Sequence, residues 1–277
     1  MKIYLYAKSG HAIGLDATRR CSAFSKFIKE YDPILCTCDF RAGAYAKEVL
    51  GIKKYVSVDI LSNLPNIMQR GDILIYDSDE ASEFMQEHMK EFCTLLYKFP
   101  EDIPYTLIDE EFFYPQKNQT IEKLIFFGDD DYNNLLLDMC EDVKDIDIPL
   151  LWGHYFFLGN EKLLADSFNT ILEEEEYINS IQSSKFLLSA SLNGCIESIA
   201  CGNKAVLLKR DDKVYDEEII NKLNLPTIKT NSITEAIELF DNITKNYPKI
   251  NQINKFDISS IKSQIAEKIE LYKKLSK

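Results

Sequence analysis

The stretch 185–209 constrains the fold of this chain more than any other part of the sequence. Residues 186–188 are a short apolar run, typical of a fully buried parallel strand. A small polar turn follows at 189–194, and then a segment with helical apolar spacing. That segment ends at Gly202, a residue type that tolerates the left-handed backbone needed just past a helix. The next apolar run, 205–208, predicts a second strand. Together these signals predict a strand–turn–helix–strand unit of an open α/β sheet.

The turn of this unit is the first candidate binding site. It lies at the carboxyl end of a strand, where open α/β sheets bind ligands, and at the start of a helix, whose N–H groups attract phosphate. Glu197, one turn into the helix, could accept hydrogen bonds from the hydroxyls of a sugar or ribose. The alternative is that the polar residues only cap the helix and that Glu197 is solvated. The candidate residues are Ser189, Ser191, Asn193, Gly194 and Glu197.

Strand-forming and helix-forming segments alternate along the whole chain, which predicts βαβ units and parallel sheets. In the first half we expect strands at 2–7, 34–39, 55–59, 72–77 and 105–108, with helices at 18–30, 42–50, 60–69 and 83–97. In the second half we expect strands at 124–127, 149–152, 186–188, 205–208 and 227–229, with helices at 132–141, 160–168, 177–182, 216–223, 233–243 and 258–275.

The length of 277 residues suits two domains of about 110–160 residues each. The polar, proline-led segment 115–119 is the best candidate for a linker, since a strand pattern restarts soon after it. We therefore expect one domain at 1–117 and a second at 118–277. The last helix is long enough to pack back on the first domain.

Charge and cysteine content exclude several classes of function. The chain has 32 basic and 45 acidic residues, a net charge of −13, and no long basic block, so a large nucleic-acid footprint is not expected. No apolar run reaches membrane-spanning length, and the one at the N-terminus is too short for a signal peptide. Seven cysteines without disulfide-module spacing, and three histidines without metal-ligand spacing, predict a cytoplasmic protein with reduced thiols and no metal site.

A second candidate site is the loop 9–17, which follows the first predicted strand. This loop carries Gly10 and Gly14 and leads into a helix with Arg19 and Arg20 in its first turn. Basic residues at a helix N-terminus oppose the macrodipole, a cost that is easier to understand if an anion binds there. The alternative is two solvated arginines. The spacing of the two glycines differs from the Gly-x-Gly-x-x-Gly pattern, which disfavours a Rossmann-type dehydrogenase.

Four stretches carry a resemblance to a known family: MKIYLYAKSGHAIGLDATRR, DILIYDSD with YTLIDEE, KLIFFGDDDYNN, and SSKFLLSASLNGCIESIACGNKAVLL. In this order they resemble the nucleotide-sugar hydrolase of pseudaminic acid biosynthesis, which acts on UDP-2,4-diacetamido-2,4,6-trideoxy-β-L-altropyranose. More distantly they are similar to the N-acetylglucosaminyl transferase of peptidoglycan synthesis.

The resemblance implies an α/β protein of the GT-B type, with two Rossmann-like domains, parallel sheets and an interdomain cleft. It implies that the C-terminal half holds a UDP- or CMP-linked sugar, with Gly128 near the phosphates, while the N-terminal loop faces the sugar. The acceptor would be water, a glycan or a protein hydroxyl. Neither a cofactor nor a metal is implied, because helix N-termini and basic side chains stabilise the leaving diphosphate.

The N-terminal loop departs from the family pattern at the catalytic position. Where the family has Gly-x-Gly-His, this chain aligns Gly14 with the first glycine, Asp16 with the second and Ala17 with the histidine. We therefore take Asp16 and His11 as candidate catalytic bases. The sequence predicts a glycosyltransferase or nucleotide-sugar hydrolase of bacterial surface glycan synthesis. The alternative is a non-catalytic nucleotide-sugar-binding protein, because Ala17 replaces the family histidine.

Overall fold

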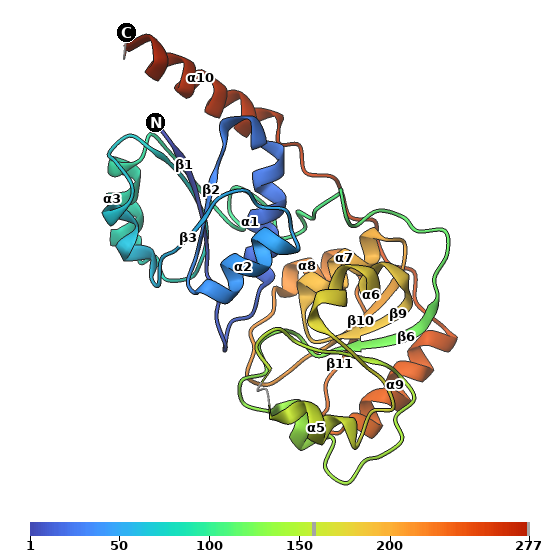
Figure 1. Cartoon of the computed structure of the whole chain (residues 1–277). Coiled ribbons are helices and arrows are strands. Elements are labelled where there is room, and N and C mark those ends of the chain that lie inside the picture. The colour runs from blue at the N-terminus through green and yellow to red at the C-terminus, as the bar shows by residue number, and fades with distance from the viewer. Residues whose placement is uncertain (157–158, 276–277) are drawn as a thin grey trace. The chain divides into compact units, whose positions relative to one another are not determined.

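The computed structural model describes residues 1–156 and 159–275 of the chain (Figure 1). These residues divide into two compact α/β units. The first unit contains Met1–Gly10, Ala17–Asp109 and the segment from Lys255 onward, and the second contains His11–Asp16 and Glu110–Asn254. The last helix therefore belongs to the first unit. The division falls at Asp109, ahead of the linker expected at 115–119.

Within the described residues, the first unit has a five-stranded parallel sheet in the order β3-β2-β1-β4-β5. The neighbouring strands β1 and β4 are buried along their whole length, as expected of strands with both faces covered. The elements are β1 (Ile3–Ala7), α1 (Asp16–Phe27), η1 (Lys29–Tyr31), β2 (Ile34–Thr37), α2 (Phe40–Glu48), β3 (Tyr55–Ser57), η2 (Leu61–Asn66), β4 (Ile73–Asp77), α3 (Glu83–Phe92), β5 (Leu95–Lys98) and α10 (Ser259–Leu275).

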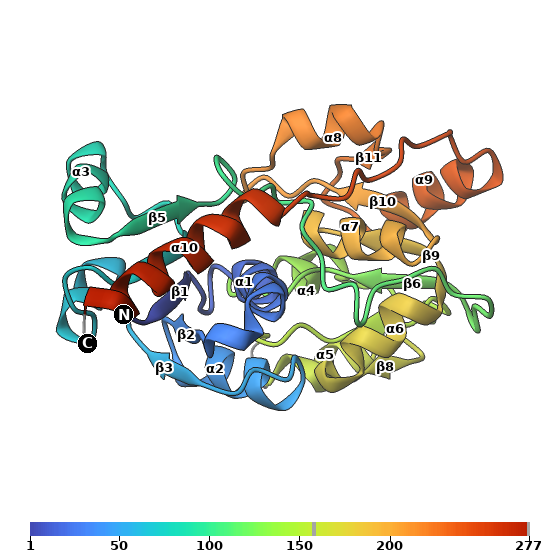
Figure 2. The same ribbon diagram turned by 90° about the horizontal axis from the view of Figure 1, so that it is seen from above.

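The two faces of this sheet are covered differently. Figure 1 shows α3 on the side of the sheet opposite to α1 and α2. The face under η2 and α3 packs around Tyr4, Tyr6, Leu74 and Tyr76. Helix α10, drawn in side view in Figure 2, contacts β5 of the same unit through the Tyr97 hydroxyl, which donates to the side-chain oxygen of Gln264 at 3.0 Å.

Three sequence predictions for the first unit are wrong. The helix expected at 60–69 is a short 3₁₀ segment, η2, which contains Pro65, a residue that cannot donate a helical hydrogen bond. The helix expected at 83–97 ends at Phe92, because Cys93 takes an extended backbone and Leu95–Lys98 form an edge strand on β4. The stretch 105–108 forms turns and no strand.

Within the described residues, the second unit has a six-stranded parallel sheet in the order β11-β10-β9-β6-β7-β8. Strand β8 was not predicted, and α4 is shorter than the expected 132–141. The elements are β6 (Ile121–Phe126), α4 (Leu135–Met139), β7 (Leu150–Leu151), α5 (Asn160–Ala165), β8 (Ile171–Leu172), η3 (Glu174–Glu176), α6 (Tyr177–Ser183), β9 (Ser184–Ser189), α7 (Leu192–Ala200), β10 (Lys204–Leu208), α8 (Glu217–Leu223), β11 (Thr227–Ile228) and α9 (Ile233–Lys245).

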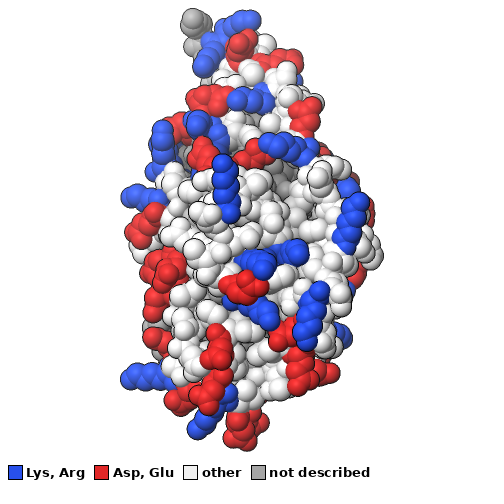
Figure 3. All heavy atoms as spheres, turned by 90° about the vertical axis from the view of Figure 1, so that its right-hand side faces the viewer, with Lys and Arg blue, Asp and Glu red and all other residues white. Residues whose placement is uncertain are grey.

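The surface carries charge of both signs. On the face drawn in Figure 3, lysine and arginine side chains are interspersed with acidic ones. Among the described residues, none of the helices combines the length and the apolarity needed to cross a membrane.

The buried thiols predict that alkali destabilises the protein. Burial raises the pKa of Cys36, Cys140 and Cys201 to about 12 each, from an ordinary thiol pKa of about 8.5. The unfolded chain therefore loses these protons at lower pH than the folded one, so their contribution to stability is complete below about pH 8.5 and is lost as the pH rises towards 12. We expect the urea midpoint to fall between pH 9 and 12. The fall should be smaller in Cys36→Val, and a pH-independent midpoint would contradict this assignment.

Candidate functional site

The strand order of the second unit places a topological switch point between β6 and β9. From β6 the chain continues to β7 and β8 on one side, whereas β9, β10 and β11 lie on the other. Ligands bind in the crevice outside the carboxyl ends of the strands at such a point. Phe126 is in register with Ser189, so the turns that follow these strands start side by side. The predicted turn and Gly128 are therefore brought to one place.

The turn after β9 is built around two buried serines. The Ser189 hydroxyl accepts from the backbone N–H of Ser191 at 3.0 Å, and the Ser191 hydroxyl accepts from that of Gly194 at 2.9 Å. Ser191 is therefore the N-cap of α7. The N-terminus of this helix, which is the positive end of the helix dipole, lies at the switch point.

Glu197 is buried, so the alternative of a solvated carboxylate is wrong. Its side chain is 2% exposed and accepts hydrogen bonds from the Tyr177 hydroxyl at 2.5 Å and from Asn193 Nδ2 at 2.9 Å. Asn193 reaches it because the two residues are four apart on one face of α7. The Tyr177 ring packs edge-on against Phe126, with 5.1 Å between ring centroids. The carboxylate is thus held in a fixed position one turn into α7.

The three aspartates of the acidic turn after β6, residues 129–131, have different partners. Gly128 has a φ of +101°, which favours glycine. Asp131 accepts from the backbone N–H groups of Leu135 and Leu136 at 2.8 and 3.0 Å; burial nevertheless raises its pKa. Asp129 accepts from the backbone N–H of His154 at 3.1 Å, which ties this turn to the segment after β7. Asp130 forms ion pairs.

Two cations that the sequence analysis did not single out neutralise Asp130. Arg210 Nη1 lies 3.0 Å from one Asp130 oxygen, and Lys213 Nζ lies 2.8 Å from the other. Burial opposes both charges, but the acids around them outweigh it and raise the pKa of each cation: Asp212 and Asp130 act on Arg210, and Asp130 and Asp16 act on Lys213. Both therefore stay charged. Their only sequence signal is the charged run KRDDK directly after β10.

The loop His11–Asp16 belongs to the second unit and brings Asp16 to the switch point. A Cβ on Gly14, whose φ is +82°, would lie 3.3 Å from the Asp130 side chain. The Ser191 hydroxyl lies 2.9 and 3.1 Å from the two carboxylate oxygens of Asp16 and donates its proton to that group. Asp16 therefore lies at the cap of α7.

The remaining predicted residues are placed differently. His11 is exposed, and its ring centroid is 5.1 Å from that of Tyr155 and 5.9 Å from that of Tyr132. Arg19 and Arg20 lie in the first unit. Arg20 Nε is 2.7 Å from an Asp77 oxygen, and its guanidinium lies over the Tyr105 ring. Arg19 Nε donates to the Tyr45 hydroxyl at 3.4 Å. The two arginines are thus engaged by residues of their own unit.

Gly153 is the tightest point under the acidic turn. A Cβ there would lie 2.2 Å from the carbonyl oxygen of Gly128 and 2.4 Å from the Phe156 ring. Because the first neighbour is backbone, Gly153→Ala must displace the turn, and we expect the free energy of unfolding to fall by about 1–3 kcal/mol in urea titrations. In Gly194→Ala the new methyl would meet Phe126 at 3.3 Å. That change should cost less, and equal losses would contradict the steric explanation.

Comparison with known proteins supports the fold. The chain matches no family profile and no curated protein. Among solved structures it is similar to a UDP-GlcNAc 2-epimerase from Neisseria meningitidis bound to UDP-GlcNAc, at 12% identity and a TM-score of 0.50, over 97% of this chain and 99% of that one. It is also similar to the Escherichia coli heptosyltransferase WaaC with ADP, at 11% identity and a TM-score of 0.48, over 89% and 98% of the two chains.

The epimerase likeness establishes architecture alone at this level of identity. The chain has an α/β fold of the GT-B type, with two parallel sheets. The predicted fold class is thereby confirmed.

Proposed function

We propose that the chain binds a nucleotide sugar at the switch point of the second unit and acts on its anomeric C–O bond. The observation that carries this proposal is the convergence of four features outside β6 and β9. These are the capped start of α7, the cations Arg210 and Lys213, the buried Glu197, and the Asp16 carboxylate.

The diphosphate would lie at the start of α7. Backbone N–H groups there point outward, and the helix dipole favours negative charge. Lys213 and Arg210 lie at the adjoining turn and would share their charge between Asp130 and the phosphates. Fixed dipoles and cations of this kind stabilise the charge that develops on a leaving diphosphate.

Asp16 is the group proposed to take up a proton. A carboxylate beside the helix that holds the diphosphate is suited to activate an acceptor hydroxyl or water. His11, on the same loop, is the second candidate, although its exposed ring and its contacts with Tyr132 and Tyr155 equally suit a surface role.

The donor is proposed to carry a UDP- or CMP-linked sugar of the pseudaminic-acid type, used in bacterial surface glycan synthesis. This part rests on the sequence resemblance. The similar epimerase structure is bound to UDP-GlcNAc and the similar heptosyltransferase structure contains ADP, so both nucleotides belong in a test panel. Water as acceptor would make the protein a hydrolase, and a glycan or protein hydroxyl would make it a transferase.

A non-catalytic nucleotide-sugar-binding protein is the second candidate. It is favoured by Ala17, which stands where the resembling family has its catalytic histidine, while the Ser189–Glu197 region keeps the family's polar residues.

The deciding experiment has two stages. A thermal-shift screen against UDP-, CMP- and ADP-sugars identifies the donor, because a ligand at 100 times its dissociation constant adds about 2.7 kcal/mol of stability. The stabilising sugar is then incubated with the protein, with and without a cell extract as acceptor source, and free nucleotide is measured. Binding with nucleotide release supports the enzyme, and binding without release supports the second candidate. No stabilisation by any member of the panel refutes both.

Glu197→Ala tests the nucleotide site directly. If the Glu197 carboxylate also accepts a hydrogen bond from a ligand hydroxyl, we expect the binding free energy of UDP, measured by calorimetry, to weaken by about 1–3 kcal/mol. Tyr177→Phe is the matched control, since it removes the hydroxyl that contacts Glu197 and leaves the carboxylate in place. If the two variants bind UDP equally well and are equally destabilised, Glu197 has a structural role only.

A further inference from the structure

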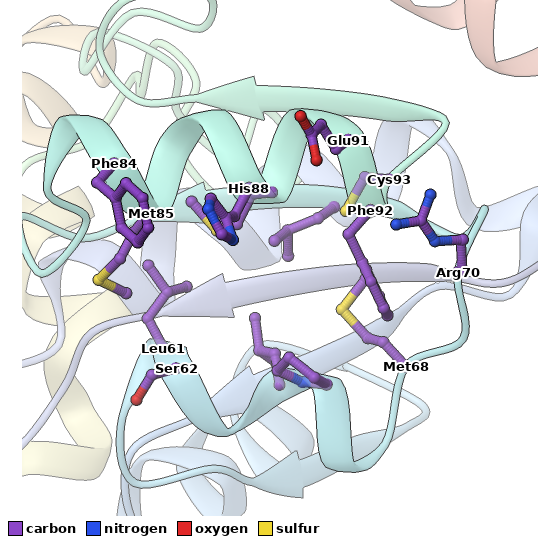
Figure 4. A pocket seen from close by; sticks show the side chains of 14 residues that line it. Leu61, Ser62, Met68, Arg70, Phe84, Met85, His88, Glu91, Phe92 and Cys93 are labelled. Carbon is purple, nitrogen blue, oxygen red and sulfur yellow. The ribbon is translucent and has the colours of Figure 1, made fainter.

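A groove in the first unit, far from the switch point in sequence, has an apolar floor and no assigned role. It lies between η2 and α3 and has a volume of about 320 Å³ (Figure 4). This volume is at the lower end of the range of small-ligand pockets, about 300–1,000 Å³. Its lining is mainly apolar and includes Leu61, Leu64, Met68, Leu74, Met85 and Met89.

The groove exists because this face of the sheet is thinly covered. Helix α3 has no buried residue, although Met85 and Met89 face the sheet and contribute to the core cluster that contains Leu74. On the same helix, the Phe84 ring at one end of the groove is 67% exposed. Apolar surface left open to water in this way is unfavourable by roughly 25 cal/mol per Å². A ligand that covers it would recover that free energy.

The groove is elongated and follows β4. Figure 4 shows Leu61, Phe84 and Met85 at one end and Met68 and Arg70 at the other. The first end lies at the carboxyl edge of the sheet, because the Leu61 backbone N–H donates to Glu80 at 2.9 Å, just after β4. The second end lies just before β4 begins. An apolar groove that follows a strand in this way suits an unbranched chain better than a ring.

The second end of the groove carries charge. Arg70 lines the groove and is exposed, and within residues 1–156 and 159–275 its guanidinium has no hydrogen bond or ion pair. Glu91 also lines the groove and, over the same residues, likewise has no ion pair. Nearer the first end, the His88 ring packs against Phe84 at 4.2 Å between centroids. The guanidinium fork of Arg70 matches a carboxylate or phosphate in a bidentate geometry.

We propose that this groove binds a single-chain aliphatic amphiphile with an anionic head. The head lies at Arg70, and the chain lies on the methionine side chains along Leu74. Methionine suits this role because its unbranched, polarizable side chain adapts to ligands of different length. Glu91 disfavours a head of high negative charge and so favours a singly charged carboxylate. The proposal is independent of nucleotide-sugar binding.

The methionines provide a direct test with decanoate as the probe. The chain has five methionines, of which Met68, Met85 and Met89 line the groove, while Met1 and Met139 lie elsewhere. In methyl NMR spectra of the full chain labelled with [¹³C-methyl]methionine, decanoate should shift the three groove signals in a saturable manner and leave the other two unchanged. Equal shifts of all five signals, or no shift, would overturn the proposal.

Charge variants then test the position of the head. Arg70→Gln should raise the dissociation constant for decanoate at least five-fold and leave that for decanol unchanged, whereas Glu91→Gln should lower the decanoate value. Lys90→Gln removes an exposed cation of α3 that does not line the groove and should have no effect. Equal effects of Arg70→Gln and Lys90→Gln would rule out a specific head site. If the groove signals shift with protein concentration alone and the protein dimerises, a second copy is the occupant and the proposal fails.

Discussion

Replacing Asp130 with alanine is expected to lower the free energy of unfolding by about 3–5 kcal/mol, the cost of removing one partner from a buried ion pair. The side chains of Asp130 and Arg210 are 6% and 4% exposed, and that of Lys213 is 19% exposed. The alanine variant leaves two cations in this buried region with less compensation. Arg210 keeps Asp212 as a partner, so most of the loss falls on Lys213. Urea titration followed by circular dichroism measures the change.

Two variants calibrate this result. Asp212→Ala removes a more exposed partner of the same Arg210, and Asp211→Ala breaks the surface pair with Lys229, in which both side chains are more than half exposed. We expect a smaller loss for the first and at most about 1 kcal/mol for the second. A loss below about 1 kcal/mol in Asp130→Ala itself would mean that solvent already screens the cluster.

The same variant connects stability to ligand binding. If Arg210 and Lys213 hold a diphosphate, removal of the competing Asp130 carboxylate frees their charge for the ligand. UDP should then bind more tightly to Asp130→Ala than to the wild type at a temperature where both are folded. Weaker binding would place the phosphates away from these cations.

Much of the second sheet was predictable from local sequence signals. The strand 186–188, the helix that ends at Gly202 and the strand 205–208 match β9, α7 and β10 within a few residues, because short apolar runs and a helix stop determine them locally. The three wrong predictions in the first unit, and the missed strand β8 in the second, lie where local signals are weak. The run 95–98 becomes a strand only because β4 offers an open edge, and pairing of this kind is a tertiary effect.

The candidate site was predictable only where its residues are close in sequence. Ser189, Ser191, Asn193 and Glu197 belong to one turn and one helix, so a single local pattern identified them. The contacts of Asp130 with Arg210 and Lys213, and of Tyr177 with Glu197, depend on the order of strands in the sheet. Local sequence patterns do not predict the order of strands in the sheet, so they do not predict these contacts.

The mutation with the largest expected effect on activity is Asp16→Asn. If Asp16 is the general base of the proposed reaction, its loss should lower turnover about 100-fold or more, the usual contribution of such a group. Asparagine keeps an oxygen that can accept from the Ser191 hydroxyl, so the cap of α7 and the position of the loop are maintained. Nucleotide affinity should therefore stay nearly unchanged, and initial rates together with calorimetry measure the two quantities separately.

Ala17→His and Ser191→Ala are the comparison variants for this experiment. On the family resemblance, a histidine at position 17 should raise hydrolysis if the sugar takes the family's pose. Ser191→Ala removes the hydroxyl that donates to Asp16 but keeps the Asp16 carboxylate. If this contact has a structural role, the Ser191→Ala variant should lose nucleotide affinity and turnover together. If Asp16→Asn also changes both together, Asp16 holds the loop to the helix cap and is not the base. Because a general base acts on the chemical step alone, only a loss of turnover at constant affinity identifies Asp16 as that base.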